Sequence, residues 1–292
     1  MNPIALYLAS GESLYAGTAL MLVLIAWRPW VRNRWLRRGH ALLVWVALAM
    51  VGMACAPVGW GWYAVLLVLV VLWWMGWEMR FAEAPRWRGA RVAAGAALAL
   101  VLVLICGMEA PWRARPQVVG ARAKKMAVIG DSISSGIGTA EKAWPELLQG
   151  RTRTEVRNLA FPGDMAADAV GRAGKISADE MLVVIEIGGN DLISGTPTEV
   201  FARNLERLLA ACSVPGRTVV MFELPMLPHR IGYGRVQREL AAKYHVQLVP
   251  KRYLVEVLAG PATTLDGLHL SGAGAERMAA MMRDLLEPVL EK

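Results

Sequence analysis

Short polar motifs in the second part of the chain carry the residue types that acyl-transfer chemistry needs. Gly130-Asp131-Ser132 follows an apolar run, and a serine hydroxyl exposed there is a nucleophile if a base reaches it. Asp266 stands three residues before His269, so its carboxylate can accept from Nδ1–H and leave Nε2 facing the serine. Alone, each motif also fits a simpler role, such as a helix cap or a surface histidine.

Two further motifs offer hydrogen-bond donors. Gly188-Gly189-Asn190-Asp191 follows another apolar run, and the Asn190 amide suits the oxyanion of a tetrahedral intermediate. Asn158 and Gly163 follow a third run, and the Gly163 N–H can point into the same site. Singly, either motif is also ordinary turn chemistry. We take Asp131 and Asp191 as residues that shape loops.

The elements that must position these motifs alternate between strand and helix. Strands are expected at 126–130, 155–160, 181–187, 218–223 and 246–249. Helices are expected at about 138–149, 165–174, 197–212, 234–244 and 271–290. Such alternation predicts a parallel sheet covered on both faces. Sites in these sheets form at the carboxyl ends of the strands, which is where the motifs fall.

Taken together, the order Ser132, Gly163, Asn190, Asp266 and His269 resembles the SGNH/GDSL hydrolase family over roughly residues 124–290. Within this family, the chain is most similar to the compact thioesterase/lysophospholipase-like branch. The resemblance implies a flavodoxin-like three-layer α/β/α fold and a Ser132–His269–Asp266 triad. It also implies an oxyanion hole built from the N–H groups of Ser132 and Gly163 and the amide of Asn190. No cofactor is implied, and no Cys-x-x-Cys or His/Cys cluster suggests a metal.

The first 120 residues have a different composition. They hold 11 Arg, no Lys and 4 Glu, for a net charge of +7, and 11 of the 12 Trp. The remaining residues hold 21 basic and 20 acidic residues, for a net charge of +1. The basic character of the chain therefore comes from its first part and gives no indication of nucleic-acid binding. With 55% hydrophobic residues, the chain is not expected to be disordered.

Apolar runs in this first part predict a membrane domain. We expect about four transmembrane helices, near 3–27, 41–58, 61–78 and 92–110, because about 20 apolar residues span a bilayer. The domains are then a transmembrane region at 1–120 and a hydrolase at 121–292. Glu12, at the edge of the first run, is read as an interfacial residue at a helix start, or alternatively as a polar group facing a substrate path.

Arginine placement predicts the orientation. The loops after the first and third runs carry nine Arg, whereas the tail before the first run and the turn between the second and third carry no Lys or Arg. The positive-inside rule puts the Arg-rich loops in the cytoplasm, with both termini and the hydrolase outside. Five basic residues that follow the fourth run oppose this, but large domains translocate largely regardless of charge. The expected location is a bacterial inner membrane, with the hydrolase periplasmic.

Two functions follow from these expectations. The first is a membrane-anchored serine esterase that cleaves acyl esters, such as lipids or lysophospholipids, at the extracytoplasmic surface, with membrane lipids around its helices. The second is an O-acetyl esterase or acetyltransferase that acts on an envelope polysaccharide or glycolipid. A membrane scaffold without activity is disfavoured, because each named residue of the constellation is present.

Overall fold

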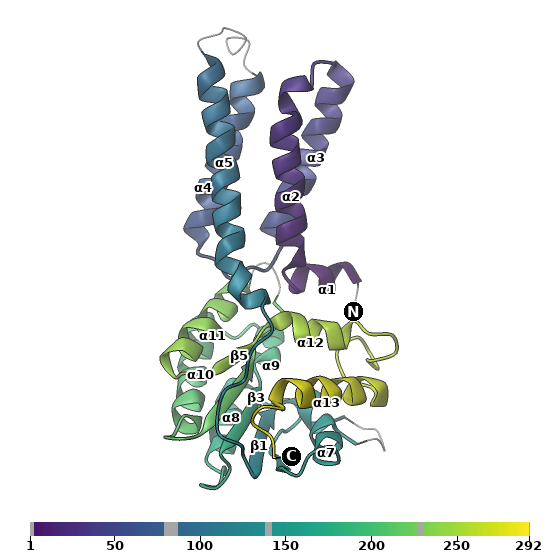
Figure 1. Cartoon of the computed structure of the whole chain (residues 1–292), viewed down its shortest axis with the longest axis vertical. Helices are drawn as coiled ribbons and strands as arrows, with labels where there is room; N and C mark the ends of the chain where they lie inside the picture. The colour runs from purple at the N-terminus through teal and green to yellow at the C-terminus, as the bar shows by residue number, and fades with distance from the viewer. Residues whose placement is uncertain (1–2, 79–86, 138–141, 227–229, 292) are drawn as a thin grey trace. The chain divides into compact units, whose positions relative to one another are not determined.

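The computed structural model describes residues 3–78, 87–137, 142–226 and 230–291 (Figure 1). Its contacts divide the chain into two compact units. One is Gly11–Ala114, and the other joins Arg115–Lys292 to the first ten residues.

The larger unit is built on a five-stranded sheet. Its strands are β1 (Lys125–Gly130), β2 (Glu155–Asn158), β3 (Leu182–Glu186), β4 (Thr218–Phe222) and β5 (Gln247–Val249). All pair in parallel, in the order β2-β1-β3-β4-β5. The predicted parallel sheet is confirmed. In this strand order the connections change direction between β1 and β3, and ligands bind at such a point.

Helices cover this sheet as the alternating pattern predicts. The predicted helices correspond to α7 (Trp144–Gln149), α8 (Ala166–Ala173), α10 (Thr198–Cys212), α11 (Ile231–Lys243) and α13 (Gly272–Leu286). Part of the first prediction, 138–141, lies outside the described residues. Three short helices follow strands directly and were not predicted: α6 (Ser132–Ser135), α9 (Gly189–Ser194) and α12 (Lys251–Leu258).

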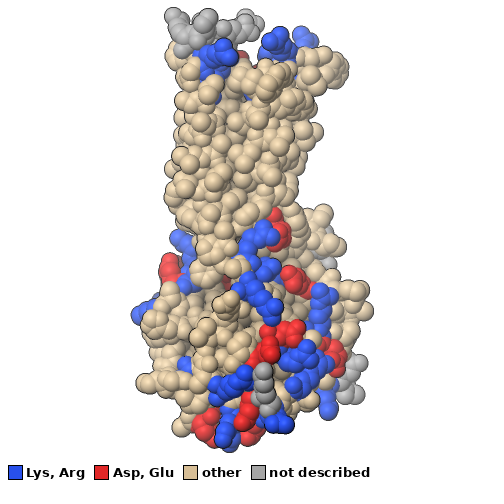
Figure 2. Space-filling model, in the orientation of Figure 1, with Lys and Arg blue, Asp and Glu red and all other residues tan. Residues whose placement is uncertain are grey.

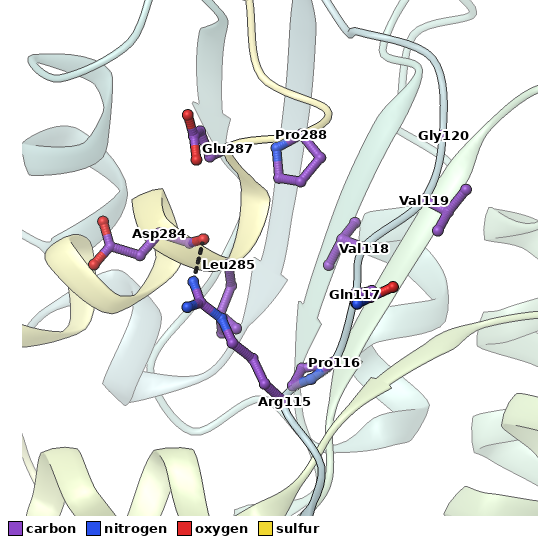
Figure 3. A pocket seen from close by; sticks show the side chains of 10 residues that line it. All are labelled: Arg115, Pro116, Gln117, Val118, Val119, Gly120, Asp284, Leu285, Glu287 and Pro288. Carbon is purple, nitrogen blue, oxygen red and sulfur yellow. Dashed lines mark hydrogen bonds between the residues drawn. The ribbon is translucent and has the colours of Figure 1, made fainter.

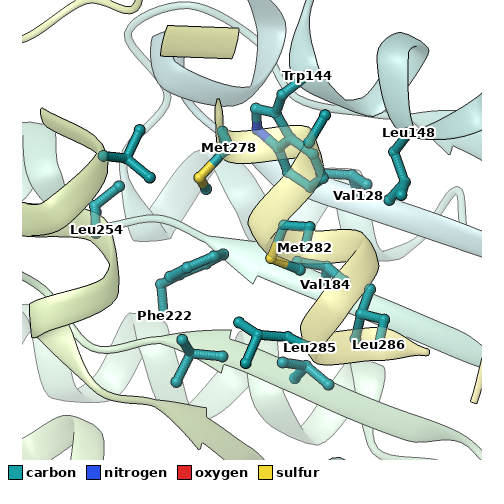
Figure 4. Packing of buried hydrophobic residues seen from close by; sticks show 14 of the residues in the cluster. Val128, Trp144, Leu148, Val184, Phe222, Leu254, Met278, Met282, Leu285 and Leu286 are labelled. Carbon is teal, nitrogen blue, oxygen red and sulfur yellow. The ribbon is translucent and has the colours of Figure 1, made fainter. Parts of the chain in front are cut away.

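One face of the sheet packs against α7, α12 and α13 around the side chain of Trp144 (Figure 4). The buried α13 residues Met278, Met282, Leu285 and Leu286 recur at the three- and four-residue spacing of a helix face. Valines and Phe222 from the strands oppose them (Figure 4). Cys212 is buried at the end of α10, where burial raises the pKa of its thiol to about 12, as befits a core residue.

The smaller unit consists of four long helices: α2 (Glu12–Trp27), α3 (Arg34–Gly52), α4 (Trp60–Glu78) and α5 (Arg88–Glu109). They pack chiefly as α2 on α3, α4 on α5 and α2 on α5. Their core is apolar, and Trp73 is its largest fully buried side chain. The two 3-10 turns Arg28–Trp30 and Ala110–Arg113 extend α2 and α5.

The helix predicted at 3–27 is interrupted. It consists of α1 (Pro3–Ala9) and α2, with Gly11 between them at φ +83°, a left-handed conformation that ends a right-handed helix. Leu6 and Ala9 of α1 belong to the core cluster of the larger unit, and α1 packs on α12. The prediction of one continuous helix over 3–27 is wrong, because α1 and α2 form a bent pair.

The helix predicted at 41–58 is displaced toward the N-terminus. Asn33 caps α3 by accepting from the Trp35 N–H at 2.9 Å, so the helix begins among the arginines and ends at Gly52. Cys55, at φ +50°, cannot continue it. In the described part of the chain, α3 is not one of the helices long and apolar enough to cross a membrane by themselves.

Two described helices meet that requirement: Trp60–Glu78 and Arg88–Arg113. A third span is possible if the bent pair Pro3–Ala9 and Glu12–Trp30 counts as one. Figure 2 shows one face of the helical unit, which is almost free of charged side chains along its length. Large apolar side chains of α4 and α5, among them Leu67, Leu72 and Leu100, are exposed on its surface.

Charged residues of the helical unit form ion pairs at the helix ends. Arg28 donates to Glu78 at 2.6 Å, and Arg113 donates to both carboxylate oxygens of Glu12 at 2.7 Å. Glu12 is the first residue of α2, and the Arg113 guanidinium also lies 4.2 Å from the ring centroid of Tyr15. The structure therefore places Glu12 at a helix start in an ion pair, in line with the simpler of its two interpretations.

Candidate active site

The predicted nucleophile lies at a tight turn at the carboxyl end of the sheet. Ser132 begins α6, two residues after β1 ends at Gly130. Gly130 leaves no space for a side chain, because a Cβ there would lie 2.6 Å from Ser134 Oγ. Gly130 also pairs in register with Glu186, the last residue of β3. Ser132 is therefore positioned at the point between β1 and β3 where sheets of this order bind ligands.

Asp131 joins this turn to the next motif. Its Oδ1 accepts from the Ile133 N–H at 3.0 Å and so caps α6, and its Oδ2 accepts from Asn190 Nδ2 at 3.4 Å. Burial raises the pKa of Asp131 to about 6, and the hydrogen bond from Ile133 opposes that rise. The predicted nucleophile and a predicted oxyanion donor thus share one carboxylate neighbour.

Asn190 is held at the start of α9, after β3. Gly188, at φ +106°, caps the helix, and this positive φ favours glycine. The Asn190 amide also donates to the carbonyl oxygen of Asp164 at 3.0 Å. Asn190 therefore contacts both the loop after β1 and the loop after β2.

The turn that carries Gly163 is fixed from several directions. Gly163 has φ +83°, and the Phe161 N–H before it donates to the carbonyl of Gly130 at 3.1 Å. Asp164 accepts from Arg172 Nε of α8 at 2.8 Å. The structure thus brings the Ser132, Gly163 and Asn190 loops together through direct hydrogen bonds.

Asp266 and His269 form the pair that their spacing predicts. His269 Nδ1 lies 2.6 Å from Asp266 Oδ2, and Asp266 Oδ1 accepts from the N–H groups of Leu268 and His269, both at 2.9 Å. These hydrogen bonds hold the pKa of Asp266 well below its usual range, and those from His269 have the largest effect. With Nδ1 as the donor, His269 Nε2 carries the lone pair that can accept a proton.

The link between this pair and the serine is not a direct hydrogen bond. Within the described ranges, no such bond joins the side chains of Ser132 and His269. In unliganded enzymes, catalytic hydrogen bonds are often long and tighten when substrate binds.

Sequence reasoning missed a buried group behind the serine. Glu186 accepts from Ser134 Oγ at 2.8 Å, and Ser134 Oγ accepts in turn from Trp144 Nε1 at 3.1 Å. Asn158 Nδ2 donates to the Ser134 carbonyl at 2.9 Å and so fixes the same turn from β2. One feature of the sequence could have indicated this group: Glu186 is a single carboxyl residue in the otherwise apolar run 181–187.

A cavity of about 600 Å³ lies elsewhere in this unit (Figure 3). The segment 115–120 and the end of α13 line it, and Arg115 donates to the Asp284 carbonyl at 3.0 Å. Gly120 of this segment lies against Thr218, the first residue of β4, so the cavity is at the amino ends of the strands. It has no part in the chemistry of Ser132.

Comparison with known proteins assigns the chain to a family. The model of the GDSL-like Lipase/Acylhydrolase family matches residues 128–277, just over half of the chain. The chain belongs to this family. Its N-terminal helical unit lies outside the match.

Individual relatives agree with this assignment. The chain is 31% identical over 186 residues to Esterase TesA of Pseudomonas aeruginosa, covering 58% of this chain and 91% of the esterase. It is 31% identical over 164 residues to an arylesterase of Vibrio mimicus, covering 50% of this chain and 80% of the arylesterase. The crystal structure of TesA is similar with a TM-score of 0.51 at 29% identity, over 57% of this chain and 99% of that one.

These matches show the activity class. The chain is a GDSL esterase that hydrolyses carboxylic esters, and its α/β unit has the SGNH hydrolase fold. The resemblance to the SGNH/GDSL family is thereby confirmed for the part of the chain that carries the motifs.

Proposed function

We propose that this esterase cleaves acyl esters with apolar chains, such as those of membrane lipids, at the extracytoplasmic membrane surface. The observation that carries the proposal is a set of exposed apolar side chains on the segments that hold the predicted catalytic residues. These side chains, here called the apolar rim, and their exposed fractions are Ile137 36%, Phe161 54%, Ile193 66% and Leu265 56%.

Each rim residue stands near one motif. Ile137 follows the Ser132 helix, Phe161 precedes Gly163, Ile193 follows Asn190, and Leu265 precedes Asp266. Exposure of such side chains to water is unfavourable. An apolar ligand that covers them gains about 25 cal/mol for each Å² of apolar surface removed from water. The rim therefore favours a substrate with an apolar acyl chain over a small, strongly hydrated one.

The proposed chemistry is acyl transfer through a Ser132–His269–Asp266 triad. His269 Nε2 takes the Ser132 Oγ proton while Oγ attacks the ester carbonyl carbon, and the carbonyl oxygen becomes an oxyanion. The N–H groups of Ser132 and Gly163 and the Asn190 amide stabilise that charge. His269 then protonates the leaving alcohol, and a water molecule, activated by the same imidazole, releases the acid and restores Ser132.

The membrane part of the proposal rests on the helical unit. The apolar lengths of α4 and α5, with their exposed leucines, favour a lipid environment. We propose four crossings by α2, α3, α4 and α5, because α3 packs along α2 and each neighbouring pair is joined by a short segment. The domains are then the transmembrane region at 1–120 and the hydrolase at 121–292, with the Arg-rich loops cytoplasmic and both termini outside.

The test is the chain-length dependence of hydrolysis. The full chain in detergent or vesicles is assayed on p-nitrophenyl esters from acetyl to palmitoyl. We expect kcat/KM to rise with chain length. The variants F161S and I193S should each lose several-fold to about tenfold in kcat/KM on long esters, with little change on the acetyl ester.

A matched control is V214S. Val214 is also exposed, at 40%, but it precedes β4 and so lies at the opposite end of the strands. It should leave the chain-length profile unchanged. Strict acetyl preference, or acyl transfer to a sugar acceptor faster than to water, would overturn the proposal in favour of an O-acetyl esterase or acetyltransferase that acts on an envelope glycan.

A further inference from the structure

Glu186 is a buried carboxyl group for which the mechanism above has no role. It ends β3 and is 1% exposed. In the part of the chain that the structure describes, no Lys, Arg or His forms an ion pair with it. An ionised carboxylate in such a place costs several kcal/mol, so the group is neutral unless something compensates its charge.

The surroundings of Glu186 fix its orientation. Its Oε2 accepts from Ser134 Oγ at 2.8 Å, and Trp144 Nε1 donates to the same hydroxyl at 3.1 Å. Asp131 is next to this group: its backbone N–H donates to Glu186, and its carboxyl group interacts with that of Glu186. The register of β1 against β3 brings the two residues together, because Glu186 pairs with Gly130 and Asp131 follows directly.

Two carboxyl groups in contact share one proton, because both cannot be ionised without strong repulsion. Burial raises the pKa of both groups, that of Asp131 to about 6 and that of Glu186 well above its ordinary value, with the charge of Asp131 adding to the rise. Both groups are buried, but Asp131 accepts hydrogen bonds from the Ile133 N–H and the Asn190 amide, which favour its charged form. The proton therefore resides on Glu186, and Asp131 accepts it in a hydrogen bond.

We propose that Glu186 is a positioning residue for the reaction: its protonated carboxyl donates to Asp131 and so fixes the Asp131 oxygens that orient the Ser132 turn and the Asn190 amide. Oδ1 accepts from Ile133 N–H at 3.0 Å, and Oδ2 from Asn190 Nδ2 at 3.4 Å. Glu186 acts through Asp131 and through its hydrogen bond from Ser134, and not on the substrate itself. The inference rests on the proposed roles of Ser132 and Asn190.

Loss of the shared proton would place two negative charges side by side in a buried position. Two further charged groups act on this pair at a distance: a protonated His269 lowers the pKa of Asp131, and Asp164 raises it. Repulsion between the two carboxylates would displace the Asp131 oxygens. Activity should therefore fall on the alkaline side through kcat, because the displaced groups act on the transition state.

The experiment compares kcat and KM of the wild type, E186Q and E186L from about pH 6 to pH 10 on one p-nitrophenyl ester. The glutamine keeps a neutral donor toward Asp131 and an acceptor for Ser134. E186Q should retain kcat within about threefold at neutral pH and lack the alkaline loss. E186L should lose about 10- to 100-fold in kcat with KM nearly unchanged.

Glu223 offers a matched control. It is also a buried glutamate, just after β4, and it accepts from Arg238 Nε at 2.7 Å and from the Lys251 N–H at 3.2 Å. E223Q should keep the shape of the wild-type pH profile. Circular dichroism confirms that each variant is folded before its kinetics are compared.

The outcomes separate this inference from the proposed function. An E186Q profile that matches the wild type, or an E186L effect confined to KM or to stability, would overturn the role of Glu186. If S132A remained active, the proposed site itself would be wrong. If S132A were inactive and the pH profile of E186Q matched that of the wild type, only the positioning role of Glu186 would be refuted.

Discussion

At the scale of single residues, the candidate site is organised around the carboxylate of Asp131. It accepts from the backbone after Ser132 and from the Asn190 amide, and it shares a proton with Glu186. Asp266 has the corresponding role for His269, with three of its hydrogen bonds converging on one short loop. Two carboxylates thus order the loops of the predicted catalytic residues, and one of them is buried whereas the other is exposed.

The most direct prediction at this scale concerns Ser132. S132A should abolish esterase activity, because no other hydroxyl in the proposed mechanism forms the acyl-enzyme. The matched variant is S135A, in the same short helix, whose hydroxyl contacts only the neighbouring Gly136 carbonyl among the described bonds. Hydrolysis of a p-nitrophenyl ester is the measurement. Comparable activity in the two variants would rule out Ser132 as the nucleophile.

Asn190 should contribute through the transition state. N190A should lower kcat by about 10²–10³ with a smaller effect on KM, since an oxyanion donor acts mainly on charge that develops during attack. Because the amide also holds the Asp164 carbonyl, the thermal midpoint of the variant is measured in parallel. An effect on KM alone would assign Asn190 to substrate binding instead.

Stability should depend on pH through Glu186. Its pKa is raised in the folded state, so above the ordinary value of 4.5 the folded protein binds more protons than the unfolded chain, and stability falls as the pH rises toward the folded pKa. Asp131, raised from 3.8 to about 6, has the same sign. The thermal midpoint of the wild type should fall more steeply with pH than that of E186Q. Parallel slopes would contradict this.

At the scale of elements, the motif-bearing loops depend on a sheet held between helix layers. Helix α13 covers one face with a stripe of Met and Leu side chains, and α7 adds Trp144, which also donates to Ser134 (Figure 4). The same face of the sheet therefore supports both the core and the turn of the predicted nucleophile. Damage to this layer should act on stability first and on catalysis only as the fold loosens.

Two adjacent methionines of α13 test this. Met282 is fully buried, whereas Met281 is only partly buried. M282A should destabilise by about 2–5 kcal/mol, and its thermal midpoint should drop by several degrees, because the substitution leaves a cavity. M281A should have a much smaller effect. Equal midpoints for the two variants would show that α13 does not pack as described.

At the scale of the whole molecule, an esterase unit and a helical unit share one chain. The family match covers the first of these, and the outward leucines of α4 and α5 distinguish the second. Arginine is concentrated in residues 28–38 and 80–91, at the ends of the apolar runs, and this placement gives the proposed orientation.

This orientation predicts the side of the membrane that the hydrolase occupies. A reporter active only outside the cytoplasm, fused after Lys292, should be active, and the chain should stay in the membrane fraction after alkaline extraction. The same reporter fused after Arg38, in the Arg-rich region, should be inactive. Activity only in the second fusion would invert the topology, and release by alkali would contradict spanning.

The sequence by itself determined which residues follow strands. Apolar runs with β-branched residues locate the five strands to within one or two residues, since strand formation and the turn after it are local properties. The chain order of Ser132, Gly163, Asn190, Asp266 and His269 was likewise legible, because a few polar residues at strand ends stand out against apolar runs.

Only the tertiary structure decided which distant residues meet. The contact between Asp131 and Glu186 depends on the register of β1 against β3, and the attachment of α1 to the esterase unit depends on one left-handed glycine at position 11. Neither leaves a periodic signal in the chain. Local preference determines where an element begins and ends, whereas the pairing of elements follows from packing summed over the whole fold. A carboxyl group stays protonated at neutral pH only where that packing removes water from it.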